Sequence, residues 1–148
     1  MILNAPATLT LADEAATTRL GAAVGGLLKV GDAVLLYGDL GAGKSTLARG
    51  LVRALTLPDE EVPSPTFTLV QQYEPRSAAR PFLSHFDLYR LADAEEAFEL
   101  GLDEAMDEGA IIVEWPQRLG ARLPPDRLDI ELTIASEGRL ARITPHGD

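Results

Sequence analysis

The residues from Gly38 to Ser45 have the types and spacing of a site that binds phosphate groups. They read Gly-Asp-Leu-Gly-Ala-Gly-Lys-Ser and fit the pattern G-x-x-x-x-G-K-[ST] of nucleotide triphosphatases. Glycines let successive backbone N–H groups turn toward one anion, and a helix that begins there adds its partly positive N-terminus. Lysine supplies a mobile charge for the β- and γ-phosphates, and the serine hydroxyl suits Mg²⁺. The predicted nucleotide-binding residues are Gly38, Asp39, Leu40, Gly41, Ala42, Gly43, Lys44, Ser45 and Thr46.

Two carboxylates lie at the C-terminal ends of predicted strands and are candidate metal ligands. Asp87 ends the segment 82–87, and Glu114 follows the apolar run 111–113. In phosphate-loop enzymes, a carboxylate near the phosphates helps to hold the Mg²⁺ that bridges the β- and γ-phosphates. The more uniformly apolar strand slightly favours Glu114, whereas Asp87 lies beside a second titratable group, His85. Both acids therefore stay as candidates.

The sequence pattern leaves the roles of three further residues open. Thr66 lies in the segment Ser-Pro-Thr-Phe-Thr (64–68), which is either a switch that offers a hydroxyl or carbonyl to the metal or γ-phosphate, or a connector stiffened by prolines. His85 is suited to proton transfer, but a single histidine in a strand is more often structural. Trp115 either belongs to the core or stacks on a base or a partner.

The elements predicted around these residues are those of an α/β fold. An apolar strand at 33–37 precedes the loop, and a helix with one apolar face follows at 46–55. Strands at 68–73 and 82–87 with a loop between them indicate an antiparallel hairpin. Strict alternation at 127–134 and 139–143, around a turn at 136–138, indicates a second hairpin with one solvent-exposed face.

The remaining segments complete the predicted fold class. The run 110–116 is typical of a strand buried on both faces, as in a parallel sheet. Helices are predicted at 13–28, with Asp13 as the N-cap, and at 95–100 and 102–106. We predict one P-loop NTPase domain over residues 1–148, with a mixed, mostly parallel central sheet flanked by helices and a C-terminal β-hairpin.

Composition narrows the classes of function. The chain has 148 residues, a hydrophobic fraction of 46% and no cysteine, so one domain without disulfides or thiolate metal sites is expected. A net charge of −10 argues against direct, strong nucleic-acid binding. With no apolar stretch of about 18 residues and no signal-peptide pattern, we expect a cytoplasmic protein. The acid-rich segment 93–108 is either a solvated helical face or a docking surface for a basic partner.

Five motifs, in this order, resemble those of the TsaE family, formerly YjeE, the small bacterial ATPases of tRNA threonylcarbamoyladenosine (t6A) synthesis. They are GDLGAGKST (38–46), SPTFTLV (64–70), HFDLYRL (85–91), LGLDE (100–104) and VEWP (113–116). The resemblance runs from about residue 13 to residue 142. It implies a weak, Mg²⁺-dependent ATPase that is needed for the t6A modification at position 37 of tRNAs reading ANN codons and is not itself the transferase.

The same resemblance implies partners and residue roles. The protein would work with TsaD and TsaB, reach tRNA only through that complex, and reset the complex by ATP hydrolysis, while TsaC supplies threonylcarbamoyl-adenylate. Lys44 and the loop would bind phosphates, Ser45 and Glu114 would meet Mg²⁺, and Asp87 would be the Walker-B-like acid. Thr66 would lie in a switch-like segment, Trp115 near the nucleotide or partner, and Arg139 against the nucleotide. The family commonly has threonine at position 45, and serine keeps the hydroxyl.

Two other functions share the phosphate loop. A small-molecule kinase of the shikimate or nucleotide kinase type needs an arginine-bearing lid, for which Arg118, Arg122 and Arg127 are candidates. The proline-containing segment 123–125 and the hairpin after it argue against a lid helix. A nucleotide-gated binding module without enzymatic activity would use the acidic segment 93–108 for docking.

Overall fold

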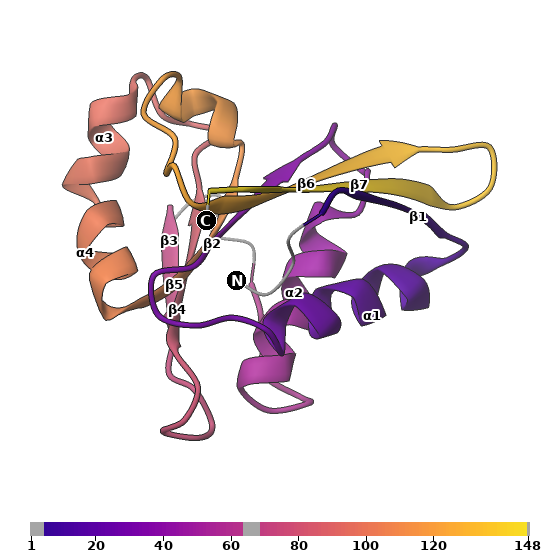
Figure 1. The fold of residues 1–148 in the computed structure, drawn as a ribbon, viewed down its shortest axis with the longest axis horizontal. Coiled ribbons are helices and arrows are strands. Elements are labelled where there is room, and N and C mark those ends of the chain that lie inside the picture. The colour runs from indigo at the N-terminus through magenta and orange to yellow at the C-terminus, as the bar shows by residue number, and fades with distance from the viewer. Residues whose placement is uncertain (1–4, 64–68, 148) are drawn as a thin grey trace.

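The computed structural model describes residues 5–63 and 69–147 of the chain (Figure 1). These residues form a seven-stranded sheet of order β1-β7-β6-β2-β5-β4-β3. The strands are β1 (Ala7–Leu11), β2 (Ala33–Tyr37), β3 (Val70–Tyr73), β4 (Phe82–Asp87), β5 (Gly109–Glu114), β6 (Arg127–Ile134) and β7 (Arg139–His146).

The central strands β6, β2, β5 and β4 run parallel, and β3 and β7 run against them. This arrangement confirms the predicted mixed, mostly parallel sheet and both predicted hairpins. The apolar runs of β2 and β5 are fully buried, because helices cover both faces of the sheet there. Since the parallel strands share one direction, the loop after β2 meets the acids that end β4 and β5 at the same edge of the sheet.

The helices are α1 (Glu14–Gly25), α2 (Lys44–Leu55), α3 (Ala94–Glu99) and α4 (Leu102–Glu108), with a 3-10 turn η1 (Pro116–Leu119). The predicted N-cap of α1 is confirmed, since a carboxylate oxygen of Asp13 accepts from the Ala16 N–H at 2.8 Å. This helix ends three residues earlier than predicted. Its last residue is Gly25 and its C-cap is Gly26, and glycine is a poor helix former.

The helices form two layers on opposite faces of the sheet (Figure 1). One apolar cluster joins α1 and α2 to the side chains of Val34, Leu36 and Ile112. The other joins α3, α4 and η1 to Leu35, Ile111 and Val113. Successive strand residues therefore point to opposite layers, as the pleat requires.

Glycines let α1 approach α2 closely. A methyl group on Gly21 would lie 2.1 Å from the carbonyl oxygen of Leu47, and one on Gly50 would lie 2.3 Å from that of Thr18. These contacts are backbone atoms, which cannot rotate away. The position of α2, which begins at Lys44, is therefore fixed by the absence of side chains at the helix crossing.

Two elements lie outside the predicted set. Strand β1 pairs antiparallel with β7, so the sheet has one more strand beyond the C-terminal hairpin. The alternation of threonine and leucine over residues 8–11 is the signal for it, although it spans only four residues. The second element is η1, directly after Trp115. Within residues 5–63 and 69–147, every helix is too short or too polar to cross a membrane.

Candidate functional site

The phosphate loop joins the end of β2 to the start of α2, as predicted. Gly43 is the N-cap residue of α2 and has φ +109°, a left-handed conformation that favours glycine. A methyl group on Gly38 would lie 2.7 Å from the carbonyl oxygen of Leu132. No side chain caps the N-terminus of this twelve-residue helix in the described structure. Its first N–H groups are therefore available to an anion.

Arg139 of β7 contacts the outer side of this loop. Its Nη2 donates to the carbonyl oxygen of Gly41 at 3.0 Å, and its Nε donates to that of Ala42 at 3.2 Å. Both carbonyls thus point toward the guanidinium. Arg139 also lines a groove beside the loop, so its predicted contact with nucleotide stays a prediction.

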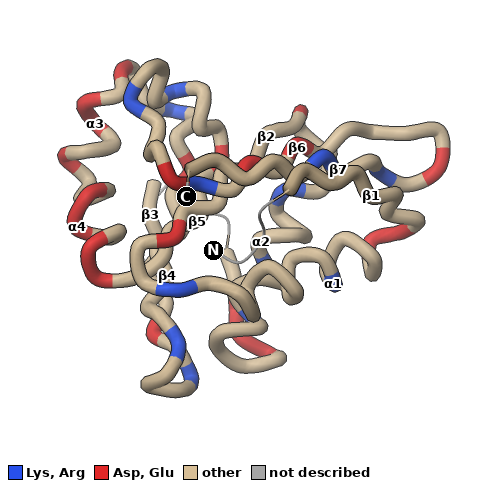
Figure 2. Tube along the Cα trace, in the orientation of Figure 1, with Lys and Arg blue, Asp and Glu red and all other residues tan. Residues whose placement is uncertain are grey.

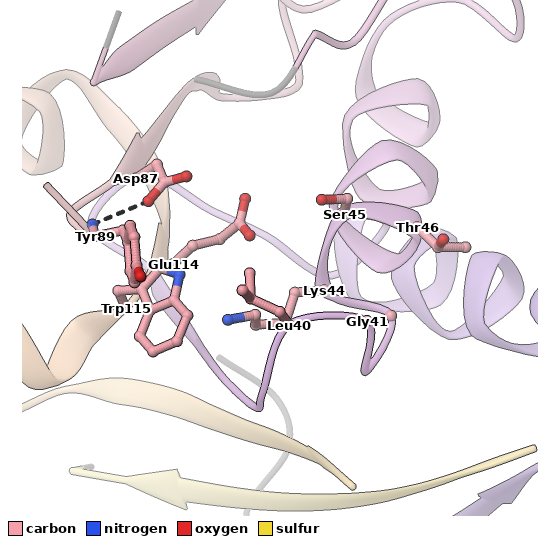
Figure 3. Close-up of a pocket in the computed structure, with 10 residues that line it drawn as sticks. Leu40, Gly41, Lys44, Ser45, Thr46, Asp87, Tyr89, Glu114 and Trp115 are labelled. Carbon is pink, nitrogen blue, oxygen red and sulfur yellow. Dashed lines mark hydrogen bonds between the residues drawn. The ribbon is translucent and has the colours of Figure 1, made fainter. Parts of the chain in front are cut away.

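The two candidate metal acids lie side by side. Asp87 and Glu114 are register partners on the parallel strands β4 and β5, and each is 5% exposed. Figure 3 shows both carboxylates at the pocket that Lys44 and Ser45 line. Asp87 Oδ1 accepts from the Tyr89 N–H at 3.0 Å. The sequence offered these two acids as alternative metal ligands. The structure places both of them at the same pocket.

Lys44 is a buried cation whose ammonium has no hydrogen-bond acceptor among the described residues. Its Nζ lies 3.8 Å from the centroid of the Trp115 ring, a cation–π contact. Burial lowers the pKa of Lys44, and the nearby carboxylates of Glu114, Asp87 and Asp39 oppose that effect. A buried ammonium without an acceptor is suited to receive an incoming anion.

Trp115 reaches the pocket because the chain turns sharply after β5. The residue has φ +59°, which is rare for a residue with a side chain, and Pro116 begins η1 directly after it. Its ring packs on that of Tyr89, with 4.8 Å between centroids and 50° between planes. Trp115 is thus partly packed and also lines the pocket, and its stacking on a base or a partner stays a prediction. Tyr89 was missed as a pocket residue, although its place two residues after Asp87 is a usable signal.

Three cavities border the loop. One, of about 360 Å³, is lined by Gly38, Asp39, Ala42 and Trp115 among others. The other two meet at the loop. The first has a volume of about 380 Å³ and is lined by Leu40, Gly41, Gly43, Lys44, Ser45, Thr46, Asp87, Tyr89, Glu114 and Trp115 (Figure 3). The second is a groove of about 280 Å³ between the start of α1 and the turn before β7. It shares Gly41, Gly43 and Thr46 with the first. Asp13, Glu14 and Thr17 line this groove and were also missed, because a capping residue and its neighbours carry no nucleotide signal.

The donor set of the first cavity fits Mg²⁺ held together with phosphates. The described residues contain no group of three or more histidine and acidic side chains arranged for a metal. They offer two carboxylates and the hydroxyl of Ser45. Mg²⁺ is usually bound by one or two carboxylates together with water and substrate phosphates. Such a cation would be held only when the nucleotide is present.

Thr66 lies outside the described residues. Of the three arginines considered for a kinase lid, Arg118 lies 6.0 Å from the centroid of the Tyr89 ring, and the other two have acidic partners. Arg122 pairs with Glu95 at 2.7 Å, and Arg127 pairs with Asp129 at 3.1 Å. Neither lines the first cavity. The chain beyond them forms β6, as the predicted hairpin requires.

The acidic segment forms the exposed side of α3 and α4, where Figure 2 shows the acidic residues gathered. Some of these acids have local tasks. Asp93 caps α3 by accepting from the Glu96 N–H, and Glu96 in turn accepts from the Ala92 N–H. Helix capping explains why these residues are acidic, so no partner protein is needed to account for them. The docking role of the surface stays a prediction.

Comparison with known proteins gives one consistent family. The model of the family "Threonylcarbamoyl adenosine biosynthesis protein TsaE" matches residues 11–142. A tRNA threonylcarbamoyladenosine biosynthesis protein TsaE of Nostoc sp. is 38% identical over 98% of this chain and 90% of its own length. That of Treponema pallidum is 39% identical over 82% of this chain and 87% of its own. The crystal structure of YdiB from Bacillus subtilis superposes with a TM-score of 0.79 at 28% identity, covering 99% of this chain and 90% of YdiB.

Proposed function

Because the chain belongs to the TsaE family of threonylcarbamoyl adenosine biosynthesis proteins, we propose that it is the Mg²⁺-dependent ATPase that serves t6A modification of tRNA. It acts with TsaD and TsaB homologues and meets tRNA only through their complex. Since t6A is made on tRNA, we place this work in the cytoplasm. The choice of ATP over GTP rests on the family, since the described residues contain no base-reading pattern that we can identify.

The observation that carries the proposal is the Lys44 ammonium. A cation that is 5% exposed and lacks an acceptor is costly unless an anion completes its surroundings. The uncapped start of α2 lies beside it, and the carboxylates of Asp87 and Glu114 supply oxygen ligands. A polyphosphate with a divalent cation satisfies all of these groups at once.

Each residue then has a defined task. The loop amides of residues 38–46 bind the phosphate oxygens, and Lys44 leaves the Trp115 ring to pair with the β- and γ-phosphates. Ser45, Asp87 and Glu114 would hold Mg²⁺, which would supply charge neutralisation at the transferred phosphoryl group. For Thr66, which lies outside the described residues, we keep the switch-like role that the family resemblance implies. Arg139 contacts the nucleotide from the groove beside the loop.

The lining of the cavity supports weak hydrolysis that a partner stimulates. Within the part of the chain that the structure describes, no arginine lines the first cavity. An arginine that stabilises the transition-state charge contributes about 10³–10⁵ to the rate in related phosphoryl transfers, and a partner can supply it. The isolated chain would therefore bind ATP and turn it over slowly, until the TsaB–TsaD complex completes the site.

One assay tests the proposal. ATP hydrolysis is measured with the purified chain, with TsaB and TsaD added, and with tRNA and threonylcarbamoyl-adenylate added, while t6A formation is followed. We expect slow hydrolysis alone, faster hydrolysis with the complex, and t6A over repeated turnovers only when this chain is present. Phosphate transfer to a metabolite instead of water would favour a kinase. Nucleotide binding without turnover under every condition would favour a binding module.

A further inference from the structure

Among the described residues, His85 is the side chain that forms a hydrogen bond with the buried carboxylate of Glu114. His85 lies on β4 and is 2% exposed, and Glu114 ends the neighbouring strand β5. The imidazole Nε2 lies 2.7 Å from Glu114 Oε2. A carboxylate only accepts hydrogen bonds, so the Nε2 of His85 carries the proton and donates it.

The other ring nitrogen of His85 gives evidence on the role of this side chain. The Nδ1 of His85 is buried and has no hydrogen-bond partner within residues 5–63 and 69–147. Buried polar atoms kept for structure are usually satisfied, and burying one without a partner costs free energy. The register partners of His85 are the apolar Ile112 on β5 and Gln71 on β3. The side-chain hydrogen bond of the imidazole that the described structure shows is the one to Glu114.

The geometry points to His85 as a positioning residue for Glu114. We propose that its Nε2–H fixes Glu114 Oε2 and so holds the carboxylate in the rotamer that presents Oε1 to the cation of a bound Mg²⁺–nucleotide. Without the bond, a glutamate side chain with three rotatable torsions would have to be ordered when nucleotide binds. Residues that orient a metal ligand in this way typically contribute 10–100-fold to metal affinity or activity. This inference rests on the proposed function, because it assigns His85 to the same nucleotide site.

Two variants separate this role from a structural one. In His85→Gln the amide nitrogen can reach the position of Nε2 and donate to Glu114, whereas in His85→Asn the shorter side chain reaches only the position of Nδ1. Both bury an amide, so their costs of desolvation are similar. Phe86→Leu is the control for stability, because Phe86 is buried on the opposite face of β4 and does not line the first cavity.

The primary measurement is nucleotide binding as a function of free Mg²⁺, by calorimetry, with thermal unfolding alongside. For His85→Asn we expect the Mg²⁺ midpoint to rise about 10–100-fold. His85→Gln should recover most of that shift, and Phe86→Leu should lower the melting temperature without moving the midpoint. A wild-type midpoint in His85→Asn, or equal midpoints in the Asn and Gln variants, would overturn the inference.

A spectroscopic measurement on the unaltered chain gives a second test, independent of nucleotide. The sequence has only two histidines, so the ¹⁵N signals of the His85 ring can be assigned with a His146→Gln variant. We expect a protonated Nε2 and a bare Nδ1 in His85, and a change of the Nε2 signal in Glu114→Gln. A proton on Nδ1 alone would overturn the inference. If the wild-type chain bound no nucleotide while the ring signals were as expected, the proposed function would fail instead.

Discussion

At the scale of residues, the site is defined by charged side chains that are buried close together. Lys44 has an aromatic ring in place of an acceptor, and Asp87 and Glu114 lie together although both are acidic. Such an arrangement is costly in the free protein and favourable once a cation and a polyphosphate enter. Function and stability should therefore respond in opposite directions when one of these charges is removed.

The first prediction concerns Lys44→Met, which keeps the apolar stem and removes the charge. Because burial outweighs the attraction of the nearby carboxylates in lowering the pKa of Lys44, the charged form is disfavoured in the folded state. We expect an unchanged or higher melting temperature together with a loss of ATP turnover of about 100-fold or more. Steady-state hydrolysis and thermal unfolding measure the two effects. Lys29→Met, at an exposed turn position, is the matched control and should alter neither.

The second prediction concerns Asp87→Asn. Asparagine keeps an oxygen that can accept from the Tyr89 N–H, so the turn after β4 should persist while the charge is lost. We expect the Mg²⁺ concentration that gives half-maximal ATPase activity to rise by about 10-fold or more, because one ligand contact of the metal is lost. Asp129→Asn, another strand acid whose partners are Arg127 and His146, serves as the control. An unchanged Mg²⁺ requirement would remove Asp87 from the ligand set.

At the scale of elements, two features position these residues: the crossing of α1 over α2 and the turn after β5. The crossing fixes where the N-terminus of α2 lies, and the turn brings an aromatic ring back over the loop. Both depend on backbone conformation or close backbone contact more than on side-chain chemistry.

The crossing gives the third prediction. In Gly21→Ala the new methyl group meets the backbone oxygen of Leu47 at 2.1 Å, so α1 must shift away from α2. We expect a loss of about 1–3 kcal/mol in the free energy of unfolding, the usual cost of overpacking. In Gly26→Ala the nearest atom is 3.5 Å away and φ is −65°, so stability should stay equal or rise by about 0.4–1 kcal/mol. Urea unfolding of both variants measures the difference, and equal stabilities would show that α1 can move freely.

The turn gives the fourth prediction. Trp115→Ala removes the ring from Lys44 and Tyr89 but leaves the strand β5 intact. Because Trp115 is only partly buried, we expect a change in nucleotide affinity that exceeds any change in the free energy of unfolding. Calorimetric titration with Mg²⁺–ATP and thermal unfolding measure the two. A large drop in melting temperature with unchanged affinity would identify Trp115 as a core residue.

At the scale of the whole molecule, ligand binding should be visible as stability, because the site joins α2 to the ends of β4 and β5. The fifth prediction is that Mg²⁺–ATP at about 100 times its dissociation constant adds about 2.7 kcal/mol, or roughly 5–10 °C in melting temperature. Chelation of Mg²⁺ should remove most of this gain, since the two carboxylates then face the phosphates without a cation. Lys44→Met should show none of it, and an equal gain without Mg²⁺ would argue against a metal site.

Much of this protein is encoded locally. The glycines and the lysine of residues 38–45 specify an anion site by their spacing, and the apolar and alternating runs specify the strands 33–37, 82–87 and 127–134. The same local patterns gave the mixed sheet and the two hairpins, because period-two alternation and uniform burial reflect short-range geometry. Even the N-cap at Asp13 follows from a side chain and a backbone N–H three residues apart.

Other features arise only when distant segments meet. Three contacts depend on strand order and register. Asp87 is the register partner of Glu114, His85 forms a hydrogen bond with Glu114 across 29 residues, and Arg139 donates a hydrogen bond to a loop 97 residues away. A one-dimensional pattern carries the type of each side chain but not its neighbour across the sheet, since register is set by the packing of both layers. The sequence by itself therefore determined which chemistry this chain can perform, and the tertiary structure decided which residues perform it together.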